Sequence, residues 1–315
     1  MSAQVESMAF FGAVPWHGLG TALETTDLYD WPKACIKSGL DWEVELTPLV
    51  TADTQATVGH RGVRRKSDGR ILGVVGPRFT VLQNRQAFAW FEPFLEAKEA
   101  TLQTAGSLQE GSRIWVLAKL QRDPIVVAQG DEVEKFVLLS HGHDGSLAVR
   151  CGFTPIRVVC QNTLSMAHGS QASKLIRIKH SRSVHKNLAA IREIINRTNQ
   201  EFEATADQYR FLATKSISQE DLCKYVKRVL KVEDGQEPGT RTLNTLQQII
   251  DLCESGRGNN LPSVSGTYWT AYNGVSEWLS YKRGRNQQNR LNSLWFGDSA
   301  NLNRHALETA LAMAM

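Results

Sequence analysis

The stretch between residues 136 and 169 constrains the fold most, because strand, turn and helix signals follow one another there. The runs 136–140 and 146–153 are rich in β-forming residues, and the Asp-Gly pair at 144–145 is typical of a hairpin turn with positive φ. The Thr-Pro pair at 154–155 is typical of a helix start. Thr can accept a hydrogen bond from an unpaired backbone N–H of the first turn, and Pro has no N–H that would remain unpaired there. We therefore expect a β-hairpin followed by a helix.

A candidate basic groove lies on the elements that follow this hairpin. In the predicted helix, Arg157 and Gln161 share one flank, outside an apolar stripe with spacings of three and four. The next strand-like run, 174–180, puts Arg177 and Lys179 on one face, because side chains alternate along a strand. Only a short connection separates the two elements, so we expect these four side chains to lie close together.

Two further arginines, Arg64 and Arg65, belong to a cation-rich strand signal at 57–66. Such a cluster is either a solvated edge that discourages sheet stacking or a strand that follows phosphates, and both interpretations stay open. If this strand adjoins the groove, Arg64 and Arg65 extend it. A competing interpretation of the groove itself is that Arg157 pairs with Asp144 and pins the helix to the hairpin.

The chain of 315 residues exceeds a typical domain of roughly 100–150 residues. Hairpin and alternation signals dominate residues 1–180, and helical periodicity dominates residues 181–315. The expected fold class is α+β, with a mostly antiparallel sheet and packed helices in the first region and a helical second region.

A heptad-like series predicts that the second region opens with a long helix. From Val184 to Leu212, apolar residues and two threonines recur at alternating spacings of four and three. Thr198 and Thr205 would weaken an isolated dimer seam, so we expect this face to dock on later helices of the same chain. Pairing with a second copy, which would give a homo-oligomer, is the alternative.

Bulk composition gives few constraints on function. The 36 Lys and Arg only slightly outnumber the 32 Asp and Glu, so any surface for nucleic acid must be local. The five cysteines are odd in number and have no CxxC spacing, which indicates reduced thiols and a cytoplasmic location. No apolar run approaches 18 residues, so we expect no membrane partner.

The sequence contains no convincing catalytic centre. His141, His143 and Asp144 resemble part of an HxHxDH metal motif, but Gly145 and Ser146 stand where its next Asp and His would be, and a hairpin turn explains the segment. There is no GxSxG, no dinucleotide fingerprint and no paired zinc spacing. We therefore predict no catalytic residue, no metal and no cofactor.

Six motifs in order resemble a family called domain of unknown function 932. They are PWHGLG at 15–20, GLDW at 39–42, RFTVLQN at 78–84, HDGS at 143–146, TPIRVVCQNTL at 154–164 and GTYW at 266–269. The resemblance implies an origin in a phage or plasmid, and it supplies no mechanism. By looser analogy, single-strand annealing proteins of phage recombination are also α+β, often multimeric and without a catalytic site.

These observations predict a non-catalytic nucleic-acid-binding protein, with single-stranded DNA as its partner and annealing during recombination as its task. One alternative is a metal-dependent enzyme that acts on nucleic acid through His143 and Asp144. Another is a structural or host-interaction protein that binds no nucleic acid.

Overall fold

The computed structural model describes residues 5–12, 20–157, 159, 162–163, 176–181, 199–232, 238–284 and 290–315. The chain forms two compact units, and each is described by itself. The first comprises Met1–Arg122, Phe136–Phe153 and Lys174–Thr198, and the second comprises Asp123–Lys135, Thr154–Ser173 and Asn199–Met315. These boundaries differ from a single division at residue 180, because residues 123–135 group with the C-terminal helices.

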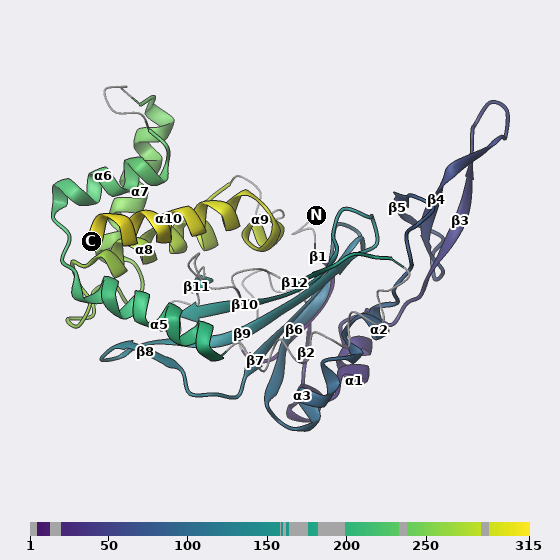
Figure 1. Cartoon of the computed structure of the whole chain (residues 1–315), viewed down its shortest axis with the longest axis horizontal. Helices are drawn as coiled ribbons and strands as arrows, with labels where there is room; N and C mark the ends of the chain where they lie inside the picture. The colour runs from purple at the N-terminus through teal and green to yellow at the C-terminus, as the bar shows by residue number, and fades with distance from the viewer. Residues whose placement is uncertain are drawn as a thin grey trace. The chain divides into compact units, whose positions relative to one another are not determined.

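A mostly antiparallel sheet confirms the predicted α+β class. Its strands follow the order β11-β10-β9-β7-β6-β1-β2, with β12 paired to β10 and β8 paired to β9 (Figure 1). Only the β1–β2 pair is parallel among the pairings of the described residues. The bounds are β1 Val5–Phe10, β2 Thr21–Ala22, β6 Ala100–Leu108, β7 Arg113–Leu120, β8 Ile125–Ala128, β9 Asp131–Gly142, β10 Val149–Arg157, β11 Asn162–Thr163 and β12 Ile176–Ile178.

The predicted hairpin is confirmed, because β9 and β10 are neighbouring strands. Gly145 adopts the expected positive φ, +76°, whereas Asp144 does not have a positive φ. The Asp144 carboxylate instead accepts bonds from the Ser146 N–H at 2.9 Å and from its hydroxyl at 2.8 Å. Asp144 therefore stabilises this turn through its side chain, and only the glycine supplies the unusual backbone conformation.

The helix predicted from the Thr-Pro pair is wrong at its start. Thr154 and Pro155 lie in β10, and Ile156 pairs with Thr163 of β11. Proline also tolerates a strand end, since its fixed φ is compatible with extended backbone, and the β-branched neighbours favour the sheet. Most of the predicted helical face, including Cys160 and Gly169, lies outside the described residues, as do residues 15–19 of PWHGLG.

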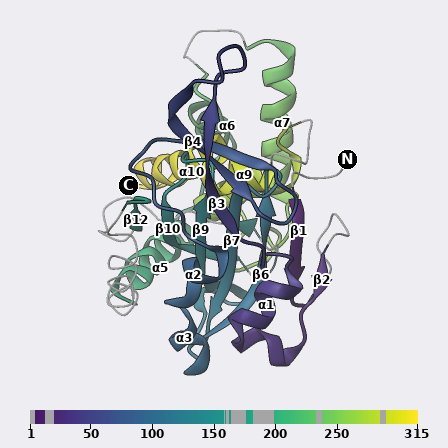
Figure 2. The ribbon, with the colours of Figure 1, turned by 90° about the vertical axis from the view of Figure 1, so that its right-hand side faces the viewer.

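A smaller antiparallel sheet is formed by β3 (Val44–Val50), β4 (Thr57–Arg65) and β5 (Ile71–Val75), in that order (Figure 2). It packs against the β9–β10 turn at Gly73, where a Cβ would lie 2.3 Å from the Asp144 Cα. A side chain therefore cannot fit at this position without movement of the turn. The contact brings the smaller sheet to the segment that carries His143 and Asp144.

Short helices complete the first unit: η1 (Thr25–Tyr29), α1 (Trp31–Lys37), α2 (Asn84–Ala89) and α3 (Glu92–Glu96). Trp31 and Phe88 meet edge to face with ring centroids 5.3 Å apart, which packs α1 on α2. Gln83 occupies the N-cap position of α2, and Asn84 is the first residue of that helix. The Asn84 side chain is used in the core.

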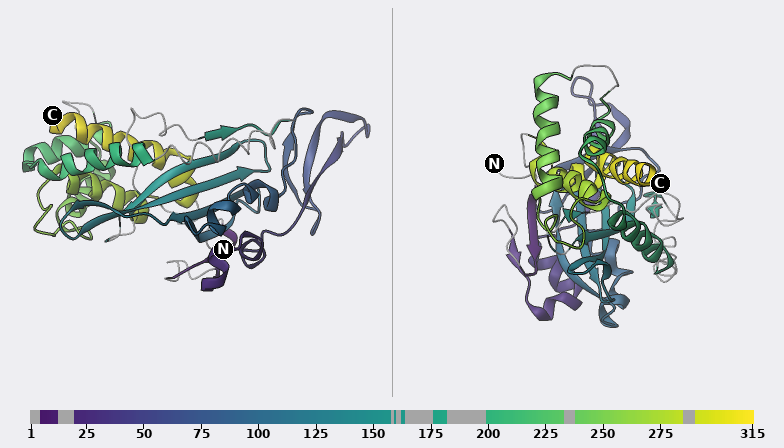
Figure 3. Two further views of the ribbon diagram at one scale, coloured as in Figure 1. Left: turned by 60° about the horizontal axis from the view of Figure 1, so that its bottom comes forward. Right: turned by 90° about the vertical axis from the view of Figure 1, so that its left-hand side faces the viewer.

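The helices of the second unit (Figure 3) are α5 (Asn199–Thr214), α6 (Gln219–Val229), α7 (Thr240–Ser255), α8 (Tyr268–Glu277), the π-helix η3 (Trp278–Lys282), α9 (Arg290–Phe296) and α10 (Asp298–Ala314). Tyr209 and Leu212 of the heptad series are buried, and the Tyr209 ring lies 4.8 Å from Trp269 of α8. The described part of the series thus docks within the chain, and residues 184–198 lie outside the described ranges. No helix among the described residues is long and apolar enough to cross a membrane.

Candidate nucleic-acid interface

Arg177 and Lys179 lie where the alternation of the sequence predicts. Arg177 in β12 and Lys179 just after it are exposed, whereas Ile178 and His180 are 7% and 9% exposed. Neither cation forms an ion pair within the described part of the chain. This short segment therefore presents two unneutralised positive charges to solvent on one face.

Arg177 is part of a cluster of arginines that comes from neighbouring strands. Its Cα is directly opposite that of Arg150 in β10, so the two side chains share a face. Burial lowers the pKa of Arg150, and the charges of Arg177 and of Arg113 in β7 lower it further. We call Arg113, Arg150, Arg177 and Lys179 the basic stripe.

One carboxylate lies beside the basic stripe. The Asp144 Oδ2 is 3.9 Å from the Arg113 Nε, and Arg113 also donates a hydrogen bond to the Ser146 hydroxyl at 3.1 Å. The Asp144 carboxylate thus offsets part of the positive charge of Arg113, while exposed Arg177 and Lys179 form no ion pair within the described residues. Like charges directly opposite each other in a sheet cost roughly 0.2–1 kcal/mol, and an anion between them would reverse that repulsion.

The other two predicted groove residues are placed differently. Arg157 ends β10 opposite Asn162, on a strand and not on a helix flank. The Arg157 side chain and the whole of Gln161 lie outside the described residues. The structure therefore brings Arg177 and Lys179 together with Arg113 and Arg150, two residues that strand alternation in 113–120 and 146–153 could have identified.

Arg64 and Arg65 lie on β4 in the smaller sheet, where they form ion pairs. Arg64 donates from Nε to Glu45 at 2.9 Å. Arg65 is 5% exposed and donates to Asp68 at 2.7–3.0 Å and to Glu6 at 2.8–2.9 Å. Hydrogen bonds to Asp68 and Glu6 raise the pKa of Arg65, and the bond from Arg65 lowers the pKa of Asp68 to about 2. This geometry favours a structural role for the cation-rich strand.

A group of three buried histidines, His141, His143 and His180, lies in the first unit. The Asn84 Oδ1 accepts from the Nε2 of His141 at 3.1 Å and of His143 at 2.8 Å, while the Asn84 amide donates to the Leu40 carbonyl at 2.9 Å. The His180 ring stacks on Phe79 with centroids 4.8 Å apart and lies 6.0 Å from His141. We call His141, His143, His180 and Asn84 the histidine node.

Burial keeps the imidazoles of the histidine node neutral. It lowers the pKa of His141, His143 and His180, that of His143 to about 3. Because a carboxamide oxygen can only accept, both nitrogens that face it carry hydrogen, which assigns the Nε2–H tautomer to His141 and His143. Across the described ranges, no three His, Cys, Asp or Glu side chains are arranged to hold a metal ion.

Three of the motifs found in the sequence meet at this node. GLDW supplies Trp42, whose ring lies 5.3 Å from that of His143, and HDGS supplies His143 itself. RFTVLQN supplies Phe79 and Asn84, and its Gln83 bonds both the N–H and the carbonyl of Val44 at 2.9 Å. The shared role of these motifs is to build a buried core behind the turn, which sequence spacing alone did not reveal.

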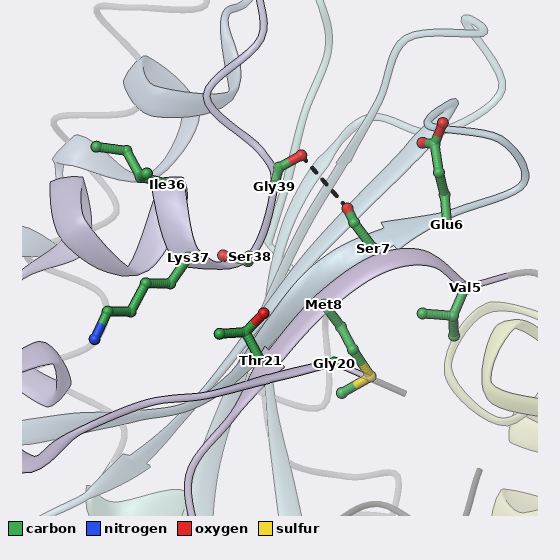
Figure 4. A pocket seen from close by; sticks show the side chains of 10 residues that line it. All are labelled: Val5, Glu6, Ser7, Met8, Gly20, Thr21, Ile36, Lys37, Ser38 and Gly39. Atoms are coloured by element: carbon green, nitrogen blue, oxygen red, sulfur yellow. Dashed lines mark hydrogen bonds between the residues drawn. The ribbon is translucent and has the colours of Figure 1, made fainter. Parts of the chain in front are cut away.

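A separate hollow of about 640 Å³ lies between β1 and the end of α1 (Figure 4). Its polar side chains are already used in internal contacts. Ser7 donates to the Gly39 carbonyl at 3.4 Å, Lys37 binds Asp27 at 2.6 Å, and Glu6 binds Arg65. No set of free polar groups converges there among the described residues, so we do not assign a function to it.

Comparison with known proteins gives a family and no activity. No curated protein and no solved structure matches the chain. A family model described as "Domain of unknown function (DUF932)" matches residues 71–295. That range contains the basic stripe and the histidine node, although GLDW and PWHGLG precede it. Since the match covers more than half of the 315 residues, the chain belongs to the family of domain of unknown function 932.

Proposed function

We propose that this protein binds nucleic acid through its phosphates, without catalysis, and that its partner is single-stranded DNA during phage or plasmid recombination. The observation that supports this proposal most directly is the basic stripe. Arg150 and Arg177 face each other across two strands, Arg113 adds to their charge, and exposed Lys179 follows. The Asp144 carboxylate lies near one member of this group, 3.9 Å from the Arg113 Nε.

Arginine suits this role because its planar guanidinium binds phosphate oxygens in a bidentate manner. Phosphate contacts give affinity that is nearly independent of base sequence. Such contacts leave the base edges free to pair, which an annealing protein requires. The cations lie on neighbouring strands of a sheet, and a positively charged surface that follows the backbone is how many proteins bind single strands without sequence preference.

The alternative of a metal-dependent enzyme has less support. His143 is 1% exposed and bonds Asn84, and Asp144 bonds Ser146 within the turn. Both side chains thus have internal structural roles. The buried, free thiols of Cys35, Cys151 and Cys253 suit a reducing compartment, so we place the protein in the cytoplasm.

The test is a double variant, Arg177→Ala with Lys179→Ala, assayed for binding to a labelled single-stranded oligonucleotide at several salt concentrations. Both residues are exposed, so folding should be retained. We expect weaker binding to all sequences and a salt slope that falls in magnitude by about 0.7 for each lost phosphate contact.

A matched control removes two cations that already have partners. Arg64→Ala with Lys66→Ala changes the net charge equally, but these side chains bind Glu45 and Glu43. Affinity and slope should change less in the control than in the Arg177 and Lys179 variant. Equal effects of the two double variants would show that net charge alone drives binding. The basic stripe could then no longer be assigned as the binding surface.

A further inference from the structure

Two adjoining hollows occur in the second unit, away from every residue of the basic stripe in sequence. One, of about 460 Å³, lies between the end of α6, η3 and the start of α10, and the other, of about 660 Å³, lies between α6 and α10. Lys231 and His305 line both. Their volumes fall within the range of roughly 300–1,000 Å³ that is usual for sites of small ligands.

The lysine and arginine side chains at these hollows form no ion pair with a carboxylate of the described residues. Neither Arg228 nor Lys231 takes part in an ion pair in the described portion of the chain. On the same helix, Lys224 binds Glu220 at 2.6 Å and also approaches Asp221 at 3.7 Å. Helix α6 thus neutralises the cation near its start and leaves those near its end available.

Arg283 is the most constrained cation at the smaller hollow. Its guanidinium lies 5.8 Å from the centre of the Trp278 ring and donates to the Ser299 hydroxyl at 3.1 Å. Partial burial lowers the pKa of Arg283, while the nearby Asp298 charge acts in the opposite direction. A half-buried guanidinium that forms no ion pair in the described residues would gain from an anionic ligand.

The other residues that line the smaller hollow indicate a ligand larger than a single phosphate ion. Asp298 and Asn301 from the first turns of α10 line the smaller hollow beside Lys231 and Arg283. A carboxylate repels a phosphate but accepts hydrogen bonds from sugar hydroxyls, and an amide can pair with a heterocycle. The volume also exceeds what one phosphate group needs.

We propose that this hollow binds a nucleotide, with Arg283 and Lys231 on the phosphate and Asp298 on the ribose hydroxyls. The ligand is either a free mononucleotide or a terminal nucleotide of a strand, which share this chemistry. The site lies in the second unit and is independent of the proposed role of the basic stripe.

The test is calorimetric titration of the full-length protein with adenosine 5′-monophosphate and, separately, with adenosine. We expect the phosphorylated probe to bind at least about tenfold more tightly. Lys231→Gln and Arg283→Gln should each weaken its binding about tenfold or more, whereas Lys224→Gln should not. Lys231 is exposed, so its variant tests the site even if the Arg283 variant does not fold.

Competition distinguishes the two sources of the phosphate. A 5′-phosphorylated oligonucleotide that displaces the mononucleotide identifies a strand end as the ligand, and failure to displace it identifies the free nucleotide. Absence of binding at millimolar mononucleotide, or unchanged affinity in the folded Lys231 variant, would overturn the proposal. The Arg177 and Lys179 double variant should keep its affinity for the mononucleotide. The proposal for this hollow and the proposal for the basic stripe can therefore be refuted independently.

Discussion

Acidification should destabilise the first unit, because the histidine node buries three neutral imidazoles. The pKa of each is lowered by burial, that of His143 to about 3. The unfolded chain, in which a histidine has a pKa of about 6.5, therefore binds more protons than the folded chain below that pH. This contribution to stability is fully present above pH 6.5 and is lost as the pH falls toward the folded pKa.

The size of the effect follows from the proton count. Each proton changes the free energy of unfolding by about 1.4 kcal/mol per pH unit, so a drop from pH 6.5 to 5 costs about 2 kcal/mol per histidine. Three histidines set an upper limit of about 6 kcal/mol over that interval. Asp68, whose pKa is lowered to about 2, loses its contribution only below pH 4, so it does not affect this window.

The assay is urea unfolding between pH 7.5 and 5, followed by tryptophan fluorescence, with hydrogen exchange in β7 to identify the first unit. His143→Gln keeps a donor for Asn84 but removes one titrating group, so its pH dependence should be shallower by about one proton. A free energy of unfolding that stays constant from pH 7.5 to 5 would refute the buried, neutral state of the node.

Three substitutions test the packing around the same core and in the second unit. Asn84→Ala should lower the free energy of unfolding in urea by about 3 kcal/mol, because it leaves the buried polar partners of Asn84 without a hydrogen bond. A loss below about 1 kcal/mol would contradict this structural role. Gly73→Ala should cost about 1–3 kcal/mol because its Cβ would clash with the β9–β10 turn, whereas Gly76→Ala, with open space around it, should be near neutral; equal melting temperatures would disprove the contact. Trp269→Phe removes the 2.8 Å bond from the indole to Asp131 and should cost about 1.5–3 kcal/mol, and an unchanged unfolding midpoint would argue against that bond.

Elements with strong local signals could be predicted from the sequence. Alternation located β7 and the exposed side of β12, and Gly145 adopts the φ that its turn requires. Ser218 caps α6 through an equally local contact, because its hydroxyl accepts a bond from the Asp221 N–H at 3.1 Å. In each case the controlling interaction is within a few residues of the signal.

The errors arise where contacts distant in sequence decide the conformation. Thr154 and Pro155 resemble a helix start, but strand pairing holds them in β10. The role of Asn84 also depends on distant residues, because histidines 57 and 59 positions away bond its side chain.

The candidate site shows the same limit. The exposure of Arg177 and Lys179 followed from the period of a strand, which is local. The meeting of Arg113 and Arg150 with Arg177 depends on strand order, which spacing cannot give. The ion pairs of Arg64 and Lys66 could have been anticipated, because Glu43 and Glu45 alternate along the preceding strand.

The most direct test of nucleic-acid binding is the affinity of the unaltered protein for a single-stranded oligonucleotide, measured without divalent metal from 50 to 200 mM salt. Three phosphate contacts, by Arg150, Arg177 and Lys179, predict a slope of log affinity against log salt of about −2. The same slope should hold for oligonucleotides of different sequence. No binding at 50 mM salt, or binding that salt does not weaken, would contradict the account.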